Sequence, residues 1–336
     1  MTNSARQEDL DRHPVATGPA AGGEVPVIDL GGPGAVEAIA AACRDWGFFQ
    51  VVNHGVPATL VDAVWRETRG YFARPDADKL ALSRTRGNPW GYYNNELTKN
   101  QRDKKEVFDL TSEGVDPIYD AANRWPADDG GFRRTMTAWF EACETLSLEL
   151  LDALGLGLGL PRGYLRPFFA PQHTGLLRLN HYPVRDPRAA LDAAPPPADL
   201  GVHHHTDAGA LTVLLQDSVG GLQVYRDGFW HDVAPLEGAF VINTADMMQV
   251  WSNDRYRAPV HRVLAMHEHD RYSLPFFFNP SADCEVRPLE DVVDSTHPPR
   301  YRPIRWAEFR GRRTDGDYAD YGPEVQIADY RIDRNS

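Results

Sequence analysis

The spacing of hydrophobic positions changes near residue 176. Before it, apolar residues recur at helical intervals over 35–46, 59–72 and 130–154, and the last segment carries one apolar stripe from Met136 to Leu154. This periodicity predicts three amphipathic helices. Short β-type runs at 25–29 and 47–53 precede the first two helices, and residues 76–125 are polar and mixed, with an aromatic loop expected at 90–93.

Beyond residue 176 the pattern is that of short strands separated by turn residues. Such runs occupy 176–182, 202–206, 210–216, 222–225, 229–233, 239–242, 259–266 and 271–278. Many short strands at this spacing favour a sandwich, jelly roll or barrel over β-α-β units. A final helix is expected over 304–312.

No linker separates the helical half from the β-rich half. We therefore expect a flexible N-terminal arm over 1–24 and a single domain over 25–336. Within it, 25–170 is predicted to be mostly helical, 171–290 to form the β core, and 291–336 to form the C-terminal helix and tail.

Charge and composition restrict the possible partners. The 336-residue chain has 35 Lys and Arg against 48 Asp and Glu, a formal net charge of -13. This balance argues against binding to nucleic acid or to an anionic membrane surface, and no apolar stretch approaches the ~18 residues of a transmembrane helix. Three cysteines far apart in sequence and an acidic N-terminus without an apolar segment predict free thiols and a cytoplasmic location.

The most informative polar pattern is a set of histidines and carboxylates on strand-like segments. His205 and Asp207 are two residues apart and can share one strand face, as can His203 and His205; His261 lies in a later strand-like run. Two imidazoles and one carboxylate around a metal leave positions open, which suits non-haem Fe(II) and oxygen chemistry. An isolated His-x-Asp pair is usually not a metal site, so the residues that follow matter.

Arg271-Tyr-Ser273 begins ten residues after His261 and supplies a second same-face pair. A guanidinium and a hydroxyl on one face can bind a carboxylate. A cationic anchor beside a three-ligand iron site is what a dicarboxylate co-substrate requires.

With these residues in this order, the chain resembles the iron- and 2-oxoglutarate-dependent dioxygenases of the isopenicillin N synthase-like type. The resemblance extends from about Val25 to about Tyr330. Further matching segments are Val25-Pro-Val-Ile-Asp-Leu30, Trp46-Gly-Phe-Phe-Gln-Val-Val-Asn-His-Gly-Val56, Arg178-Leu-Asn-His-Tyr-Pro183 and Trp251-Ser-Asn-Asp254.

The resemblance implies a mainly β fold with flanking helices. Its core would be a double-stranded β-helix, or jelly roll, wrapped by N-terminal and C-terminal helices, with the iron site in the 171–290 core. The resemblance also implies that His205, Asp207 and His261 bind Fe(II), and that Arg271 and Ser273 bind 2-oxoglutarate. Further co-substrate contacts are expected from three residues that alternate on one strand face, Arg178, Asn180 and Tyr182.

Candidate substrate-pocket residues are aromatic. Phe277 shares a strand face with Arg271 and Ser273, and Phe108, Tyr92 and Tyr93 are expected to form an outer wall. Such a pocket favours an apolar or planar small molecule. The 184–201 segment, longer than in plant members of the family, leads into the metal strand and is expected to shape substrate entry.

The activity implied by the resemblance is oxygenation of a small organic molecule, by hydroxylation, desaturation or cyclisation. Dioxygen and 2-oxoglutarate are the co-substrates, and succinate and CO2 are released. Two alternatives stay open at this point: an iron oxidase of the same fold that does not use 2-oxoglutarate, and a non-catalytic jelly-roll protein for binding or sensing. The substrate and the oligomeric state do not follow from the sequence, although a monomer is the simplest state.

Overall fold

The computed structural model describes most of the chain. The described residues are 10, 13–16, 23–98, 101–128, 130–186, 200–318 and 324–332. Most of the expected N-terminal arm, and residues 187–199 of the 184–201 segment, lie outside them.

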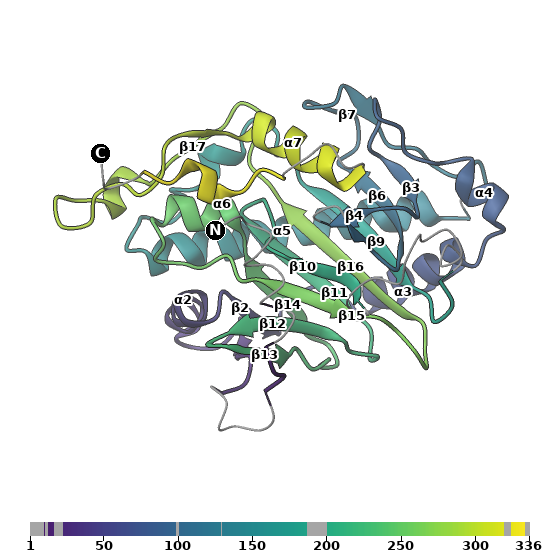
Figure 1. Cartoon of the computed structure of the whole chain (residues 1–336), viewed down its shortest axis with the longest axis horizontal. Helices are drawn as coiled ribbons and strands as arrows, with labels where there is room; N and C mark the ends of the chain where they lie inside the picture. Colours follow the sequence, from purple (N-terminus) through teal and green to yellow (C-terminus); the bar gives the residue numbers. More distant parts are fainter. Residues whose placement is uncertain are drawn as a thin grey trace.

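Two β-sheets form the core of the molecule (Figure 1). The large sheet has the strand order β1-β2-β14-β11-β16-β9-β6-β3, and the small sheet has the order β10-β15-β12-β13. The large sheet is built of β1 (Val27–Asp29), β2 (Phe48–Val52), β3 (Gly91–Tyr93), β6 (Glu106–Thr111), β9 (Leu176–Tyr182), β11 (Leu211–Gln216), β14 (Phe240–Thr244) and β16 (Arg271–Phe278). The small sheet is built of β10 (Leu200–His205), β12 (Leu222–Arg226), β13 (Phe229–Asp232) and β15 (His261–Leu264).

One hydrophobic cluster joins the two sheets. Val202, Val224 and Val263 of the small sheet pack with Leu214 and Val241 of the large sheet. The two sheets thus pack face to face over an apolar cluster, as in other two-sheet β folds. This arrangement is the predicted jelly roll.

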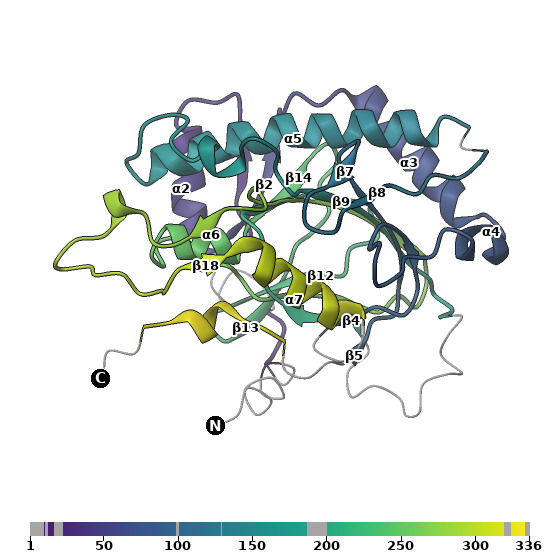
Figure 2. The same ribbon diagram turned by 90° about the horizontal axis from the view of Figure 1, so that it is seen from above.

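Helices cover the opposite face of the large sheet (Figure 2). The long helix α5 (Phe132–Gly157) runs along this face between α2 (Ala35–Asp45) and α3 (Ala58–Phe72). Its apolar stripe, which includes Met136, Trp139 and Leu150, is fully buried in the main core. The shorter helices are α4 (Asp76–Leu80), α6 (Asp246–Trp251) and α7 (Trp306–Tyr318), the last on the other side of the large sheet from α5.

Short strands and 3-10 helices complete the structure. The strands are β4 (Leu97–Thr98), β5 (Gln101–Arg102), β7 (Val115–Asp116), β8 (Ala121–Ala122), β17 (Glu285–Val286) and β18 (Ile304–Arg305), and the 3-10 helices are η2 (Arg166–Phe169), η4 (Glu290–Val292) and η5 (Ile327–Tyr330).

The N-terminal part contains more β-structure than expected. The segment 90–93 is not only a loop, because Gly91–Tyr93 pairs with β6 at the edge of the large sheet. Strands β1 and β2 extend the other edge, where Phe48 pairs with Asn243 of β14. Periodicity alone missed β3 and β6, because their residues alternate between a polar network and the core.

Residues near the chain start lie against the small sheet. The Ala16 N–H donates to the Trp230 carbonyl at 2.7 Å, and the Trp230 N–H donates to the Pro14 carbonyl at 3.0 Å. The Trp230 indole N–H donates to the carbonyl of Leu10 at 2.9 Å. This part of the expected arm is therefore attached to strand β13.

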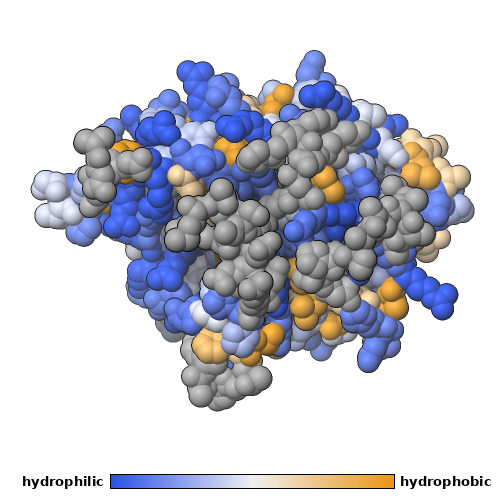
Figure 3. Space-filling model, viewed as in Figure 1, coloured by the Kyte–Doolittle hydropathy of each residue, from blue (hydrophilic) through white to orange (hydrophobic). Residues whose placement is uncertain are grey.

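The visible surface is mostly hydrophilic, and hydrophobic residues on it form small separate groups (Figure 3). Among the described helices, none combines the length and the apolar character that crossing a bilayer requires.

Candidate metal and co-substrate site

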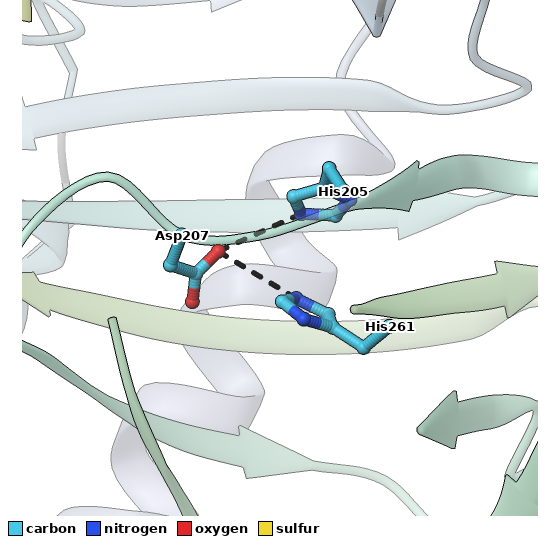
Figure 4. A group of neighbouring side chains, drawn as sticks. All are labelled: His205, Asp207 and His261. Carbon is cyan, nitrogen blue, oxygen red and sulfur yellow. Dashed lines mark ion pairs between the residues drawn. The ribbon is translucent and has the colours of Figure 1, made fainter. Parts of the chain in front are cut away.

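Strand pairing brings the two candidate histidine ligands face to face. His205 at the end of β10 pairs with His261 at the start of β15, and their ring centroids are 4.3 Å apart. The register shifts between Val202 and His205, so the strand is irregular just before the site. Asp207 lies in the loop after β10, and its carboxylate points toward both rings (Figure 4).

Three ligand atoms converge on one point. The Asp207 Oδ1 atom lies 3.5 Å from the Nε2 atoms of both His205 and His261. One ligand atom from each residue lies within 4.8 Å of the other two. Two imidazole nitrogens and one carboxylate oxygen on one side of a metal match the facial triad of non-haem Fe(II) sites.

Hydrogen bonds hold each ligand in an orientation suited to a metal. The Nδ1 atoms of His205 and His261 contact the carbonyls of His203 and Pro259 at 2.8 and 3.1 Å. A ring that donates from Nδ1 to a carbonyl keeps the Nε2 lone pair for a metal.

The second oxygen of Asp207 is held in the same way. Thr212 Oγ1 donates to Asp207 Oδ2 at 2.5 Å, and Asn243 Nδ2 donates to it at 2.9 Å. These two donors come from neighbouring strands of the large sheet, where Thr212 and Asn243 are paired. Only Oδ1 of Asp207 is then left to face the histidines.

The charge states also suit a metal site. Burial, reinforced by His205, lowers the pKa of His261 to about 4, so this ring is neutral at pH 7 and can ligate. Burial opposes ionisation of Asp207, but His261, His205 and the Asn243 hydrogen bond together hold its pKa well below the ordinary value. A neutral imidazole and an ionised carboxylate are the forms that bind metal ions.

A second polar group lies on the large sheet. Arg271 pairs with Tyr182 and Ser273 pairs with Asn180, so all four side chains share one face of β16 and β9. The Arg271 guanidinium lies 4.9 Å from the centre of the Tyr182 ring, and its Nη2 atom donates to Gln216 Oε1 at 3.3 Å. Asn180 Nδ2 donates to Ser273 Oγ at 3.3 Å.

Arg271 has hydrogen-bonding capacity left over. It is only 1% exposed, yet its Nε and Nη1 atoms have no hydrogen-bond partner among the described residues. Leaving donors of a buried cation unpaired costs free energy, so the site is built for an acceptor. A carboxylate fits this requirement because it accepts from a guanidinium and from a hydroxyl together.

Arg178 lines the cavity beside His205 and Asp207, and two carboxylates hold its side chain. Its Nε and Nη2 atoms donate to the two oxygens of Asp109, each at 2.7 Å, and its Nη1 atom donates to Glu96 Oε2 at 2.7 Å. Arg84 and Lys105 contact Glu96 at 3.2 and 2.7 Å. Arg178 thus belongs to a buried ion-pair network of these five residues.

His203 does not join the metal ligands. Its Nδ1 atom and its backbone N–H both contact Asp103 Oδ1, each at 3.1 Å. Asp103 is fully buried and also pairs with Lys105 at 3.3 Å. The contact between His203 and Asp103 fixes the strand that carries His205. Strand parity allowed two same-face pairs, His205 with Asp207 and His203 with His205, and the structure brings together the first of them at the site.

A cavity of about 120 Å³ lies beside the triad and is lined by both His205 and Asp207. Its apolar lining includes Pro89, Trp90, Leu176, Val202 and Phe277. Its charged lining consists of Arg84, Glu96, Lys105, Asp109, Arg178, Arg310, Arg313 and Glu324. The cavity is therefore far more charged than the aromatic pocket expected from the sequence.

The structure brings one of the four expected pocket aromatics, Phe277, to this cavity. Phe108 is fully buried on the helix side of the sheet, 4.4 Å from the Tyr71 ring between centroids, and Tyr92 pairs with it across β3 and β6. Tyr92 donates to Glu106 Oε2 at 2.5 Å, and Tyr93 lies under the Arg84 guanidinium at 4.0 Å. Phe108 and Tyr92 therefore belong to the core. The sequence did not predict this, because strand parity does not reveal which face of a sheet is covered by helices.

The fold and this site define a class: a non-haem iron oxygenase with a jelly-roll core. Comparison with known proteins agrees. The model of the 2OG-Fe(II) oxygenase superfamily matches residues 173–280, and that of the non-haem dioxygenase in morphine synthesis N-terminal region matches residues 25–128.

Similar proteins cover nearly the whole chain. Jasmonate-induced oxygenase 2 of Arabidopsis thaliana is 33% identical over 319 residues, which are 91% of this chain and 82% of that protein. Gibberellin 3-beta-dioxygenase 2-3 of Triticum aestivum is 33% identical over 318 residues, which are 90% of this chain and 84% of that protein. The chain belongs to the 2OG-Fe(II) oxygenase superfamily.

Solved structures support the same conclusion. The crystal structure of JOX2 in complex with 2OG, Fe and JA has a TM-score of 0.79 and 31% identity, with 96% of this chain and 91% of that chain covered. A full-length Neurospora crassa protein in complex with alpha-KG and 5-formyluracil has a TM-score of 0.75 and 28% identity, with 86% and 95% covered. The protein is an Fe(II)- and 2-oxoglutarate-dependent dioxygenase that acts on a small organic molecule.

Proposed function

We propose that His205, Asp207 and His261 hold the catalytic Fe(II), and that Arg271 and Ser273 bind the distal carboxylate of 2-oxoglutarate. Asn180 and Tyr182 line the same co-substrate site. The observation that carries this assignment is the pair of unpaired nitrogens on the buried Arg271, on the strand face shared with Ser273. Arg178 is left out of the proposed set because its nitrogens already pair with Asp109 and Glu96.

Each of these residues has a separate task. The two histidines and Asp207 fix iron on one side and leave its other positions to ligands, while Thr212 and Asn243 keep Asp207 in place. Bound Fe(II) with 2-oxoglutarate and dioxygen supplies the oxidising equivalent, with succinate and CO2 as products. The charge of Arg271, buried beside Tyr182, orients the co-substrate and excludes other small acids that lack a second carboxylate.

The assignment is tested by anaerobic titration of the purified protein with Fe(II) and 2-oxoglutarate, followed by visible spectroscopy. The chelate is expected to give a charge-transfer band in the wild type and in an Arg178→Lys variant. The band is expected to be lost in His261→Ala, and to need much more 2-oxoglutarate in Arg271→Gln. A normal band in His261→Ala would contradict the metal assignment, and turnover without 2-oxoglutarate would favour the oxidase.

We also propose that residues 25–336 form one domain. Support comes from β1 and β2, which join the sheet through β14, and from α5, which packs on the same sheet. A single unfolding transition, seen alike by tryptophan fluorescence and by circular dichroism, is expected.

For the compartment, we propose the cytoplasm. All three cysteines are buried and free, as is usual where thiols stay reduced. Cell fractionation with an antibody to the protein tests this.

A further inference from the structure

Helix α7 places the side chain of Arg310 in the cavity beside the proposed iron site. No other described residue forms an ion pair with this cation. We propose that Arg310 binds a carboxylate of the substrate, and that the substrate is a small monocarboxylic acid with an apolar body. This inference rests on the proposed function, since it assigns the cavity next to the proposed iron ligands.

Helix α7 is firmly attached to the iron site. Trp306 and Phe309 are fully buried beneath it. Arg313 Nη2 donates to the carbonyl of Thr206, the residue between the proposed ligands His205 and Asp207, at 2.8 Å. Arg313 also pairs with Glu324 at 2.7 Å. The helix is therefore in a fixed position relative to the metal.

Arg310 lies three residues before Arg313, on the same side of the helix, and both line the cavity. The Arg310 Nε atom is buried and has no hydrogen-bond partner among the described residues. No carboxylate of the described residues forms an ion pair with it. A partly buried guanidinium without a carboxylate partner gains free energy from a bound anion.

The other charges around the cavity are already matched. Arg84 and Arg178 pair with Glu96 and Asp109, Lys105 pairs with Glu96 and Asp103, and Arg313 pairs with Glu324. At the metal, the charges of Fe(II) and Arg271 balance those of Asp207 and the 2-oxoglutarate dianion. Among the described residues that line the cavity, Arg310 is thus the cation left for the substrate.

The rest of the lining describes the body of that substrate. Trp90, Leu176 and Phe277 give the cavity an apolar wall. A molecule with an apolar body against this wall and one carboxylate on Arg310 satisfies both features. A second carboxylate would meet Glu96, Asp109 or Glu324 instead of a free cation, so one acid group is favoured.

The test compares acids with their uncharged amides. Phenylacetic, cyclopentylacetic and hexanoic acids and their primary amides are titrated into the anaerobic complex of the protein with Fe(II) and 2-oxoglutarate. Binding is followed by the shift of the visible band, and succinate release in air is measured in parallel. At least one acid is expected to bind about tenfold or more tightly than its amide.

Variants of α7 identify the residue responsible. Arg310→Gln is expected to weaken acid binding about 10- to 100-fold and to leave amide binding unchanged, because it removes a charge-assisted hydrogen bond. Arg310→Lys keeps the charge and should retain a preference for the acid. Arg312→Gln, at an exposed position of the same helix, is the control and should change neither.

Several results would overturn the proposal. These are equal binding of acids and amides by the wild type, no band shift with any acid at millimolar concentration, and equal weakening of acids and amides by Arg310→Gln. If the band fails to form with 2-oxoglutarate alone, the proposed function falls and this proposal falls with it. A normal 2-oxoglutarate band without acid preference overturns only the role of Arg310.

Discussion

Replacing Arg271 by Gln is the sharpest test of the co-substrate site. The guanidinium is 1% exposed, and Gln216 uses only its Nη2 atom, so Nε and Nη1 remain for a ligand. Two hydrogen bonds to a charged partner contribute about 1.5–3 kcal/mol each. Their loss should weaken 2-oxoglutarate binding by about 3–6 kcal/mol, which is roughly 150- to 25,000-fold.

Two independent measurements give the loss of affinity for 2-oxoglutarate. Anaerobic titration of the Fe(II)-loaded protein gives the Kd for 2-oxoglutarate, and initial rates of succinate release give its KM. Arg271→Lys keeps the charge but offers one donor nitrogen, so it should fall between the wild type and Arg271→Gln. Arg287→Gln, which alters only an exposed ion pair with Glu290, serves as the matched control.

A folded Arg271→Gln variant with an unchanged Kd for 2-oxoglutarate would refute this reasoning. Folding is checked by the midpoint of urea unfolding, because the substitution also removes the contact with Gln216. A loss of stability with an unchanged Kd would make Arg271 a structural residue only.

Further predictions concern the metal and the buried charges. Asp207→Ala should lose tightly bound iron and turnover, and Asn243→Ala should weaken iron binding about 10- to 100-fold by freeing the carboxylate; iron content after gel filtration measures both. Glu96→Gln should lower the free energy of unfolding by about 3–5 kcal/mol, because it leaves buried cations unmatched, and urea unfolding measures this. Burial opposes ionisation of Glu96 and Asp103, but neighbouring cations hold both pKa values below their ordinary range. The unfolded chain then binds protons first, so their contribution is complete above about pH 5 and is lost as the pH falls further. Urea midpoints at pH 7 and pH 5 should therefore be close, and the midpoint at pH 4 should be lower; an unchanged midpoint at pH 4 would contradict this.

The sequence predicted the parts of the site that depend on local order. Strand parity placed Arg271 with Ser273 and Asn180 with Tyr182, and the observed pairing of β16 with β9 brings the two pairs together. His205 and Asp207 do lie together with His261, although Asp207 lies after the end of β10 rather than on it.

The sequence could not predict which side chains from distant segments of the chain contact these residues in the fold. Arg178 was expected to contact the co-substrate, yet Asp109 and Glu96 arrive from segments about 70 and 80 residues earlier and take its nitrogens. Phe108 was expected to line a pocket, and the helices on the large sheet bury it instead. Such outcomes depend on which faces of a sheet become covered, a property of the tertiary fold.

The sequence did not predict that Arg310 and Arg313 line the cavity. The α7 helix shows little segregation of apolar and polar faces, and three of its polar residues, Arg310, Arg313 and Thr314, line the cavity rather than solvent. The contact of Arg313 with Thr206, and the cavity that Arg310 and Arg313 share with His205 and Asp207, place this helix beside the proposed iron site.

The attachment of the chain start to β13 bears on how the protein is produced. Strand β13 is the edge of the small sheet, and Pro14 and Ala16 satisfy the exposed hydrogen-bonding groups of Trp230. An uncovered edge strand is a template for pairing with another molecule. A shortened version that begins at Val25, where the similarity to the family starts, would leave this edge bare and become prone to self-association.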